Sequence, residues 1–120
     1  MTVQPLRTQC TDARLEKVHK AFDLLRLKER EMPGQVVSCF LYIASHENCH
    51  KQSLEEALQL SSASSSRATD ILSKGRRGRK QPGLALITKV EDPDDSRRQT
   101  LQLTADGKLL AQQFKDIIYG

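Results

Sequence analysis

The sequence predicts a mainly α-helical fold with one small β-hairpin, an α+β arrangement with helices near both ends. Apolar residues recur at intervals of three and four in several segments, as they do on one face of a helix. Two short helical segments, about 53–60 and 62–74, follow each other across a tight turn. Two strand-like runs, 84–90 and 98–103, then flank a turn-rich acidic link. Two helices, a turn and a hairpin in this order predict a winged helix-turn-helix.

The N-terminal part predicts an irregular arm over 1–12 and then two helices. The first helix spans about 13–31 and carries an apolar stripe with heptad character. The stripe consists of Leu15, Val18, Phe22 and Leu25. Pro33 suits the first position of a second helix, which runs to about His46. This second helix is apolar almost all round, so we expect it to be the most buried one.

The length and composition limit the kinds of protein that this chain can be. The 120 residues fit one domain, 1–120, and the net charge of +4 favours a polyanionic partner, most often nucleic acid. The chain has no apolar run of 18 residues and no pattern of a signal peptide, so we expect a cytoplasmic protein without a membrane partner. Three cysteines, odd in number, fit free thiols in a reducing compartment. Within the domain we expect an N-terminal helix for dimerisation at 13–31, a helix-turn-helix at 53–74, a wing at 84–103 and a C-terminal helix at 105–119.

Two motifs carry a family resemblance. The helix-turn-helix motif consists of Leu54, Leu58, Leu60, Ser61, Ser66 and Arg67. The wing motif consists of Asp92, Pro93, Asp95 and Arg97, followed by Leu103, Thr104, Gly107 and Leu110. With these spacings the chain resembles the MarR family of bacterial winged-helix transcription regulators. The resemblance implies a homodimeric, sequence-specific regulator of double-stranded DNA, and we expect it to act as a repressor.

The sequence departs from the family pattern at three places. Gln59 stands where the family has a glycine at the helix-turn-helix bend, and Ser65 stands where it has an apolar residue. The chain also has one C-terminal helix where family members usually have two. Those two helices help to build the dimer and a ligand pocket, so their shortening makes a small-molecule effector doubtful. No cofactor is expected.

The second helix of the motif is expected to enter the major groove, because its side chains are short and polar. The residues expected to face DNA are Ser62, Ser64, Ser65, Ser66, Arg67 and Thr69. Arg67 is the residue among them that can form a bidentate contact with guanine. The alternative interpretation of the serine-rich start is a capped helix on an ordinary surface.

The wing and the loop before it supply further basic residues. In the family, the arginine at the position of Arg97 enters the minor groove and the aspartate at the position of Asp95 orients it. We expect Arg98 to assist, and the basic cluster before the wing to hold phosphates. That cluster consists of Lys74, Arg76, Arg77, Arg79 and Lys80. The alternatives are an Asp–Arg pair that only stiffens the turn, and a solvated charged loop.

The expected dimer surface combines the apolar stripe of 13–31 with an apolar patch in the C-terminal helix. Its residues are Leu15, Val18, Phe22, Leu25, Phe114, Ile117 and Ile118. In the alternative, the same side chains only cover the core of their own domain. A two-fold dimer places its recognition helices roughly 34 Å apart, one turn of DNA.

Other chemistry has little support in the sequence. His46, Cys49 and His50 lie close together, but no second pair of ligands completes a zinc site, so no metal is expected. Cys10 and Cys49 remain candidates for an oxidant-sensing thiol, whereas Cys39 lies on the apolar helix and is expected to be inert. No catalytic set is present, so we do not expect an enzyme. The competing hypothesis is a winged-helix module that binds a protein, which an acid-dominated recognition face would favour.

Overall fold

The computed structural model describes residues 9–74, 83–95 and 97–120. Across these ranges the chain forms five helices and a small antiparallel sheet, which confirms the predicted α+β fold class. The helices are α1 (Ala13–Lys28), α2 (Gly34–Ser45), α3 (Lys51–Leu58), α4 (Ser62–Leu72) and α5 (Ala105–Tyr119). The strands are β1 (Cys49–His50), β2 (Ile87–Glu91) and β3 (Gln99–Leu103).

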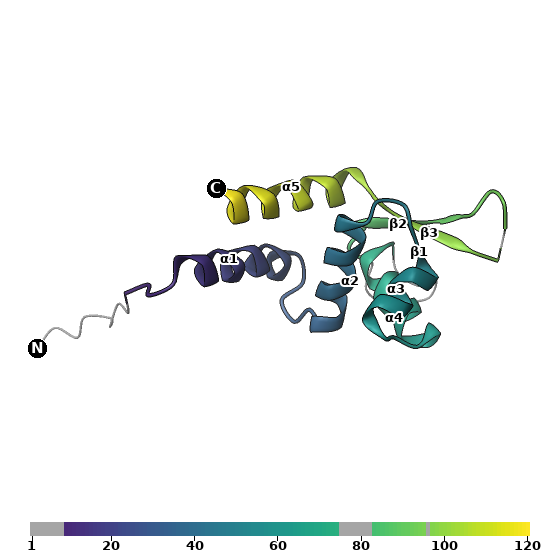
Figure 1. Ribbon diagram of the computed structural model, residues 1–120, viewed down its shortest axis with the longest axis horizontal. Coiled ribbons are helices and arrows are strands. Elements are labelled where there is room, and N and C mark those ends of the chain that lie inside the picture. Colours follow the sequence, from purple (N-terminus) through teal and green to yellow (C-terminus); the bar gives the residue numbers. More distant parts are fainter. Residues whose placement is uncertain (1–8, 75–82, 96) are drawn as a thin grey trace, which may run out of the picture.

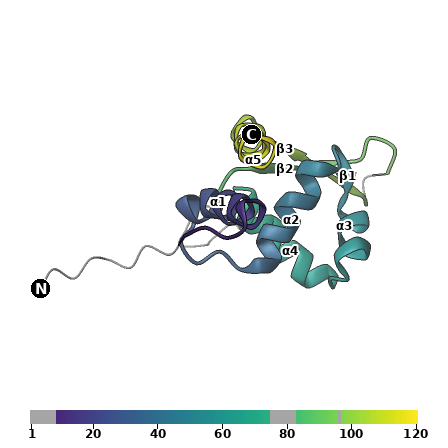
Figure 2. The same cartoon turned by 60° about the vertical axis from the view of Figure 1, so that its left-hand side comes forward.

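The molecule consists of a body, formed by α2, α3, α4 and the sheet, and an arm, formed by α1 and α5 (Figure 1). α1 and α5 run antiparallel, side by side, and their free ends form the tip of the arm, away from α3, α4 and the hairpin (Figures 1 and 2). At this tip Lys17 Nζ donates to the carbonyl oxygen of Gly120 at 2.6 Å. The helix-turn-helix and the wing therefore occupy one end of the molecule, and the two terminal helices the other.

The core is built around α2, which is the most buried helix, as predicted. Five of its residues are buried, and the ring of Phe40 packs on that of Phe114 in α5 with the centroids 6.0 Å apart. Cys39 is completely buried, and burial raises the pKa of its thiol to about 11. A thiol with so high a pKa stays protonated and inert near neutral pH, as expected for this residue.

The sheet contains one strand more than the predicted hairpin. β2 pairs with β3, from Ile87 opposite Leu103 to Glu91 opposite Gln99, and β1 pairs with the other edge of β3. No strand was predicted between His46 and residue 53, and yet Cys49 and His50 form β1. Two residues are too few for an alternating pattern to reveal a strand.

The start of α5 explains the Leu-Thr-x-x-Gly motif. The hydroxyl of Thr104 accepts from Gly107 N at 3.0 Å and donates to the carbonyl oxygen of Ala85 at 2.7 Å. The backbone N–H of Thr104 donates to Leu86 O at 3.0 Å. A Cβ atom on Gly107 would lie 2.0 Å from this same oxygen, so only glycine fits here. The motif fastens the wing to the first turn of α5.

The ends of several elements differ from the predicted ranges for a local reason. Residues 84–86 do not belong to β2, because the backbone N–H groups of Leu84 and Leu86 donate to the carbonyl oxygens of Ile71 and Leu72. These bonds satisfy carbonyl groups at the C-terminal end of α4, which ends at Leu72. Across 9–74, 83–95 and 97–120, no helix is long and apolar enough to cross a bilayer.

Candidate nucleic-acid interface

The N-terminal half of α4 presents hydroxyl groups and one guanidinium group at the surface. Ser61 caps the helix by accepting from Ser64 N at 3.0 Å. Ser62 and Arg67 are exposed, and Ser64 and Ser66 are half-buried. Arg67 Nη2 donates to Ser64 Oγ at 3.2 Å. This side of α4 can donate several hydrogen bonds to a ligand.

Two residues predicted to face DNA lie on the opposite side of α4. Ser65 and Thr69 are completely buried, because they fall on the same helix face as Ala68 and Leu72, which pack into the core. Thr69 Oγ1 donates to the carbonyl oxygen of Ser65 at 2.8 Å, so its hydroxyl is satisfied within the helix. The prediction that Ser65 and Thr69 contact DNA is therefore wrong.

Ser65 instead joins the two helices of the motif. Its hydroxyl donates to the carboxylate of Glu55 in α3, and Lys51 Nζ donates to the same carboxylate at 2.8 Å. Burial raises the pKa of Glu55, but the hydrogen bonds from Lys51 and Ser65 outweigh burial, and the pKa lies below its usual value. A polar network thus replaces the apolar contact that the family pattern has at this position.

At the wing tip, two arginines, Arg97 and Arg98, contact the carboxylate of Asp95. Asp95 Oδ1 accepts from the backbone N–H of Arg97 at 3.0 Å and from its Nε at 3.2 Å, and Arg98 Nε lies 3.8 Å from Asp95 Oδ2. The backbone hydrogen bond from Arg97, followed by the bond from its side chain, lowers the pKa of Asp95. The Arg97 side chain is 89% exposed and lies largely in solvent, while Asp95 binds its backbone N–H and its Nε.

A hollow of about 320 Å³ lies between the wing and the helix-turn-helix. We call it the wing hollow. Its lining consists of His50, Lys51, Gln52, Glu55, Ser62, Arg97, Arg98 and Gln99. The structure therefore brings the two wing arginines and the first residue of α4 to a single depression.

A second contact connects the wing to α4. Lys89 Nζ on β2 lies 2.5 Å from Asp70 Oδ1, and both side chains are largely buried. The sequence analysis missed this pair, because nineteen residues separate its members and no local pattern connects them. Lys74, which follows the C-cap of α4, is exposed. The other members of the predicted basic cluster, Arg76, Arg77, Arg79 and Lys80, lie outside the described residues.

The predicted dimer surface divides into exposed and buried residues. Leu15 is 67% exposed, and Val18, Phe22 and Ile118 are exposed as well, whereas Ile117 is half-buried. Leu25 and Phe114 are buried in the core of their own domain, so their assignment to a dimer surface is wrong. Tyr119, 82% exposed on α5, is an apolar surface residue that the sequence analysis did not single out.

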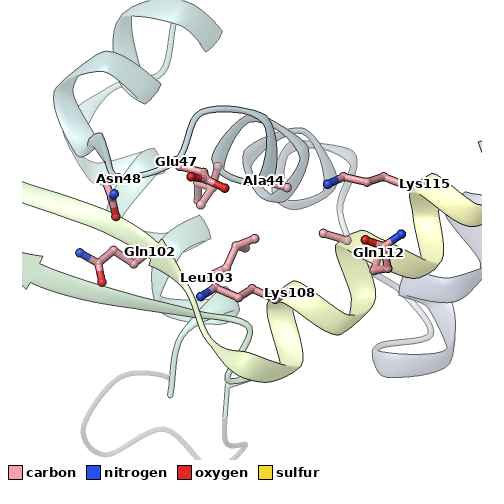
Figure 3. A pocket seen from close by; sticks show the side chains of 10 residues that line it. Ala44, Glu47, Asn48, Gln102, Leu103, Lys108, Gln112 and Lys115 are labelled. Atoms are coloured by element: carbon pink, nitrogen blue, oxygen red, sulfur yellow. The ribbon is translucent and has the colours of Figure 1, made fainter.

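A separate pocket of about 290 Å³ lies between the end of α2, β3 and α5 (Figure 3). The side chains of Gln102, Lys108 and Lys115 approach it from β3 and α5, and that of Glu47 from the turn after α2 (Figure 3). None of its lining comes from α3 or α4. Among the described residues, no group of three His, Cys, Asp or Glu side chains is placed to hold a metal ion.

Comparison with known proteins identifies the architecture. No protein-family model and no curated protein matches the sequence. Solved structures do match: MepR of S. aureus bound to DNA has a TM-score of 0.68 and 21% identity, covering 88% of this chain and 77% of its own. The chain has the winged-helix fold of the MarR regulators.

Two further structures show the same fold. PcaV, a transcriptional regulator from Streptomyces coelicolor, has a TM-score of 0.58 and 20% identity, with coverage of 88% of this chain and 71% of PcaV. A MarR transcriptional regulator from Methanosarcina mazei Go1 has a TM-score of 0.62 and 16% identity, with coverage of 89% and 72%. The MarR-like fold extends over most of this chain although few residues are identical.

Proposed function

We propose that this winged-helix protein binds double-stranded DNA in a sequence-specific manner and regulates transcription. The observation that carries the proposal is the wing hollow, in which Arg97 and Arg98 lie beside Ser62 at the start of α4. A recognition helix and a wing that share one side of the molecule can approach the same duplex. The net charge of +4 and the DNA-bound structure of MepR support the same function.

The basic and hydroxyl groups on the surface of α4 and the wing tip each have a place in this proposal. Arg67, with Ser62, Ser64 and Ser66 around it, reads base edges in the major groove. Arg97 enters the minor groove, where a narrow groove concentrates negative potential. Arg98, Lys74 and the basic residues that follow Lys74 in the sequence contact phosphates, and these contacts position the protein without reading sequence.

Two acidic residues of the wing, Asp92 and Asp95, lie beside basic side chains. Asp95 is paired with Arg97 and Arg98, and Asp92 lies 3.7 Å from a nitrogen of His50. The charge of Asp95 is therefore balanced locally, and this weakens the case for a module that binds a basic protein instead of DNA.

We propose further that the protein acts as a homodimeric repressor. The exposed apolar residues Leu15, Val18, Phe22 and Ile118 lie on the arm, away from α4. A second arm packed against them would produce a two-fold dimer with two recognition helices, suited to an inverted repeat. Occupation of such a site in a promoter blocks transcription.

A selection from random duplexes at two salt concentrations tests this function. We expect enrichment of an inverted repeat, with affinity that falls as salt rises because phosphate contacts release counterions. Arg67→Ala and Arg97→Ala should each weaken binding by about 1–3 kcal/mol, roughly 5- to 150-fold. Arg14→Ala, an exposed arginine on α1, is the matched control and should bind like the wild type. Wild-type affinity in both interface variants would refute the site.

A further inference from the structure

His50 has a buried ring nitrogen that faces a carboxylate without a hydrogen bond. It lies in β1, opposite Thr100 of β3, and lines the wing hollow. Its Nδ1 atom is buried without a hydrogen-bond partner, and it lies 3.7 Å from Asp92 Oδ2. In a neutral ring, Nδ1 either has no hydrogen, so that its lone pair faces the carboxylate, or has a hydrogen but no positive charge. A protonated ring turns this contact into an ion pair.

The carboxylate that faces His50 is held in place by the wing turn. Asp92 Oδ1 accepts from Asp94 N at 2.8 Å, and the backbone N–H of Asp92 donates to Arg98 O at 2.9 Å. The side chain of Asp92 is only 14% exposed. Because His50 precedes α3 and Asp92 follows β2, an ion pair between them connects the helix-turn-helix to the wing.

Three cations line the hollow beside His50, and Asp92 is the carboxylate that faces its ring. Lys51, Arg97 and Arg98 line the hollow, and positive neighbours disfavour a further positive charge. The acids of the region are already engaged: Glu55 with Lys51, and Asp95 with both arginines.

The neighbouring thiol adds no charge to this region, because burial raises the pKa of Cys49. A phosphate group in the hollow would offset the three cations and would favour a charged imidazole.

We propose that His50 takes up a proton when the wing hollow receives a backbone phosphate of DNA, so that DNA binding tightens as the pH falls. The protonated ring pairs with Asp92, holds the wing against α3 and adds one positive charge beside the phosphate. The inference rests on the proposed function and adds a regulation to the same site. Histidine suits this role because its ordinary pKa lies near neutral pH.

The test measures DNA affinity between about pH 7.5 and pH 6, where histidine titrates. The chain has three histidines, so His19→Gln/His46→Gln leaves His50 as the only one. We expect the wild type and this double variant to gain affinity as the pH falls, by at most about tenfold per pH unit for one proton. His50→Gln should flatten the dependence, and Asp92→Asn should reduce it.

A direct measurement follows the His50 ring by NMR in the same double variant. Addition of the selected duplex should move the titration of His50 to higher pH, and inorganic phosphate as the probe shows whether a free anion has the same effect. An unchanged titration with DNA, or a full pH dependence in His50→Gln, would overturn the inference while DNA binding stands. Absence of DNA binding at every pH would instead refute the proposed function and this inference together.

Discussion

Gly107 offers the sharpest test of how the wing is fastened to α5. In Gly107→Ala the new Cβ atom would lie 2.0 Å from the carbonyl oxygen of Leu86, and side chains essentially never approach closer than 3.0 Å. The oxygen must therefore move by about 1 Å relative to the helix, which is enough to break its hydrogen bond from the backbone N–H of Thr104.

The expected cost follows from three contributions. Loss of the hydrogen bond costs about 1 kcal/mol, overpacking costs about 1–3 kcal/mol, and the better helix propensity of alanine returns about 1 kcal/mol. The free energy of unfolding should therefore fall by about 2 kcal/mol, which lowers the Tm by roughly 8 °C in a domain of this size.

Thermal and urea unfolding of the purified protein measure this effect. Gly34→Ala is the matched control, because no heavy atom lies within 4 Å of its added Cβ atom. It should stabilise the protein by about 0.4–1 kcal/mol. A Gly107→Ala variant as stable as the wild type would show that the wing and α5 are not locked together as argued.

Three further predictions follow from the same structure. Gln59 has a left-handed backbone with φ of 54°, so Gln59→Gly should raise the free energy of unfolding by about 0.5–1 kcal/mol in urea titrations, and a loss of stability would contradict this. The lowered pKa of Glu55 stabilises the fold above the pKa of the unfolded chain and is lost as the pH falls through the folded value. Thermal melts of Glu55→Gln should accordingly show lower stability than wild type near pH 7 but a smaller decline between about pH 5 and pH 3, and parallel declines would argue against the network with Lys51. Leu15→Asp removes an apolar side chain from both halves of the proposed dimer and should weaken it by about 2–4 kcal/mol in sedimentation experiments. Leu27→Asp, an exposed leucine off the apolar stripe, should leave the dimer intact, and equal effects of both changes would refute the arm as the interface.

The sequence predicted which segments form helices and strands better than it predicted which of their residues are exposed. The order of helices and the hairpin follow from local patterns: apolar spacing, the serine cap at Ser61 and the acidic turn of the wing. Whether a residue within α4 faces inward depends on where the neighbouring helices lie. Ser65 and Thr69 have the short polar side chains expected of a DNA-binding surface, and yet both lie on the side of α4 that packs into the core.

Long-range polar contacts were outside the reach of sequence reasoning. The pair of Lys89 with Asp70, and the approach of His50 to Asp92, join segments that are distant along the chain. The approach of His50 to Asp92 depends on β1 and β2 both pairing with β3, and the two-residue length of β1 concealed that arrangement. In contrast, the prediction that Gln59 departs from a glycine position was informative, because the residue adopts the conformation that glycine prefers.

The central place of β3 has a mechanical consequence for the hairpin. A two-stranded ribbon can pivot about its base, whereas β3 is bonded to β1 on one edge and to β2 on the other. The hairpin is therefore restrained at both edges of β3, which limits how far the span between α4 and Arg97 can change. In the proposed complex, a duplex whose two grooves do not match that span has to deform to fit, so the three-stranded sheet would select DNA by its shape.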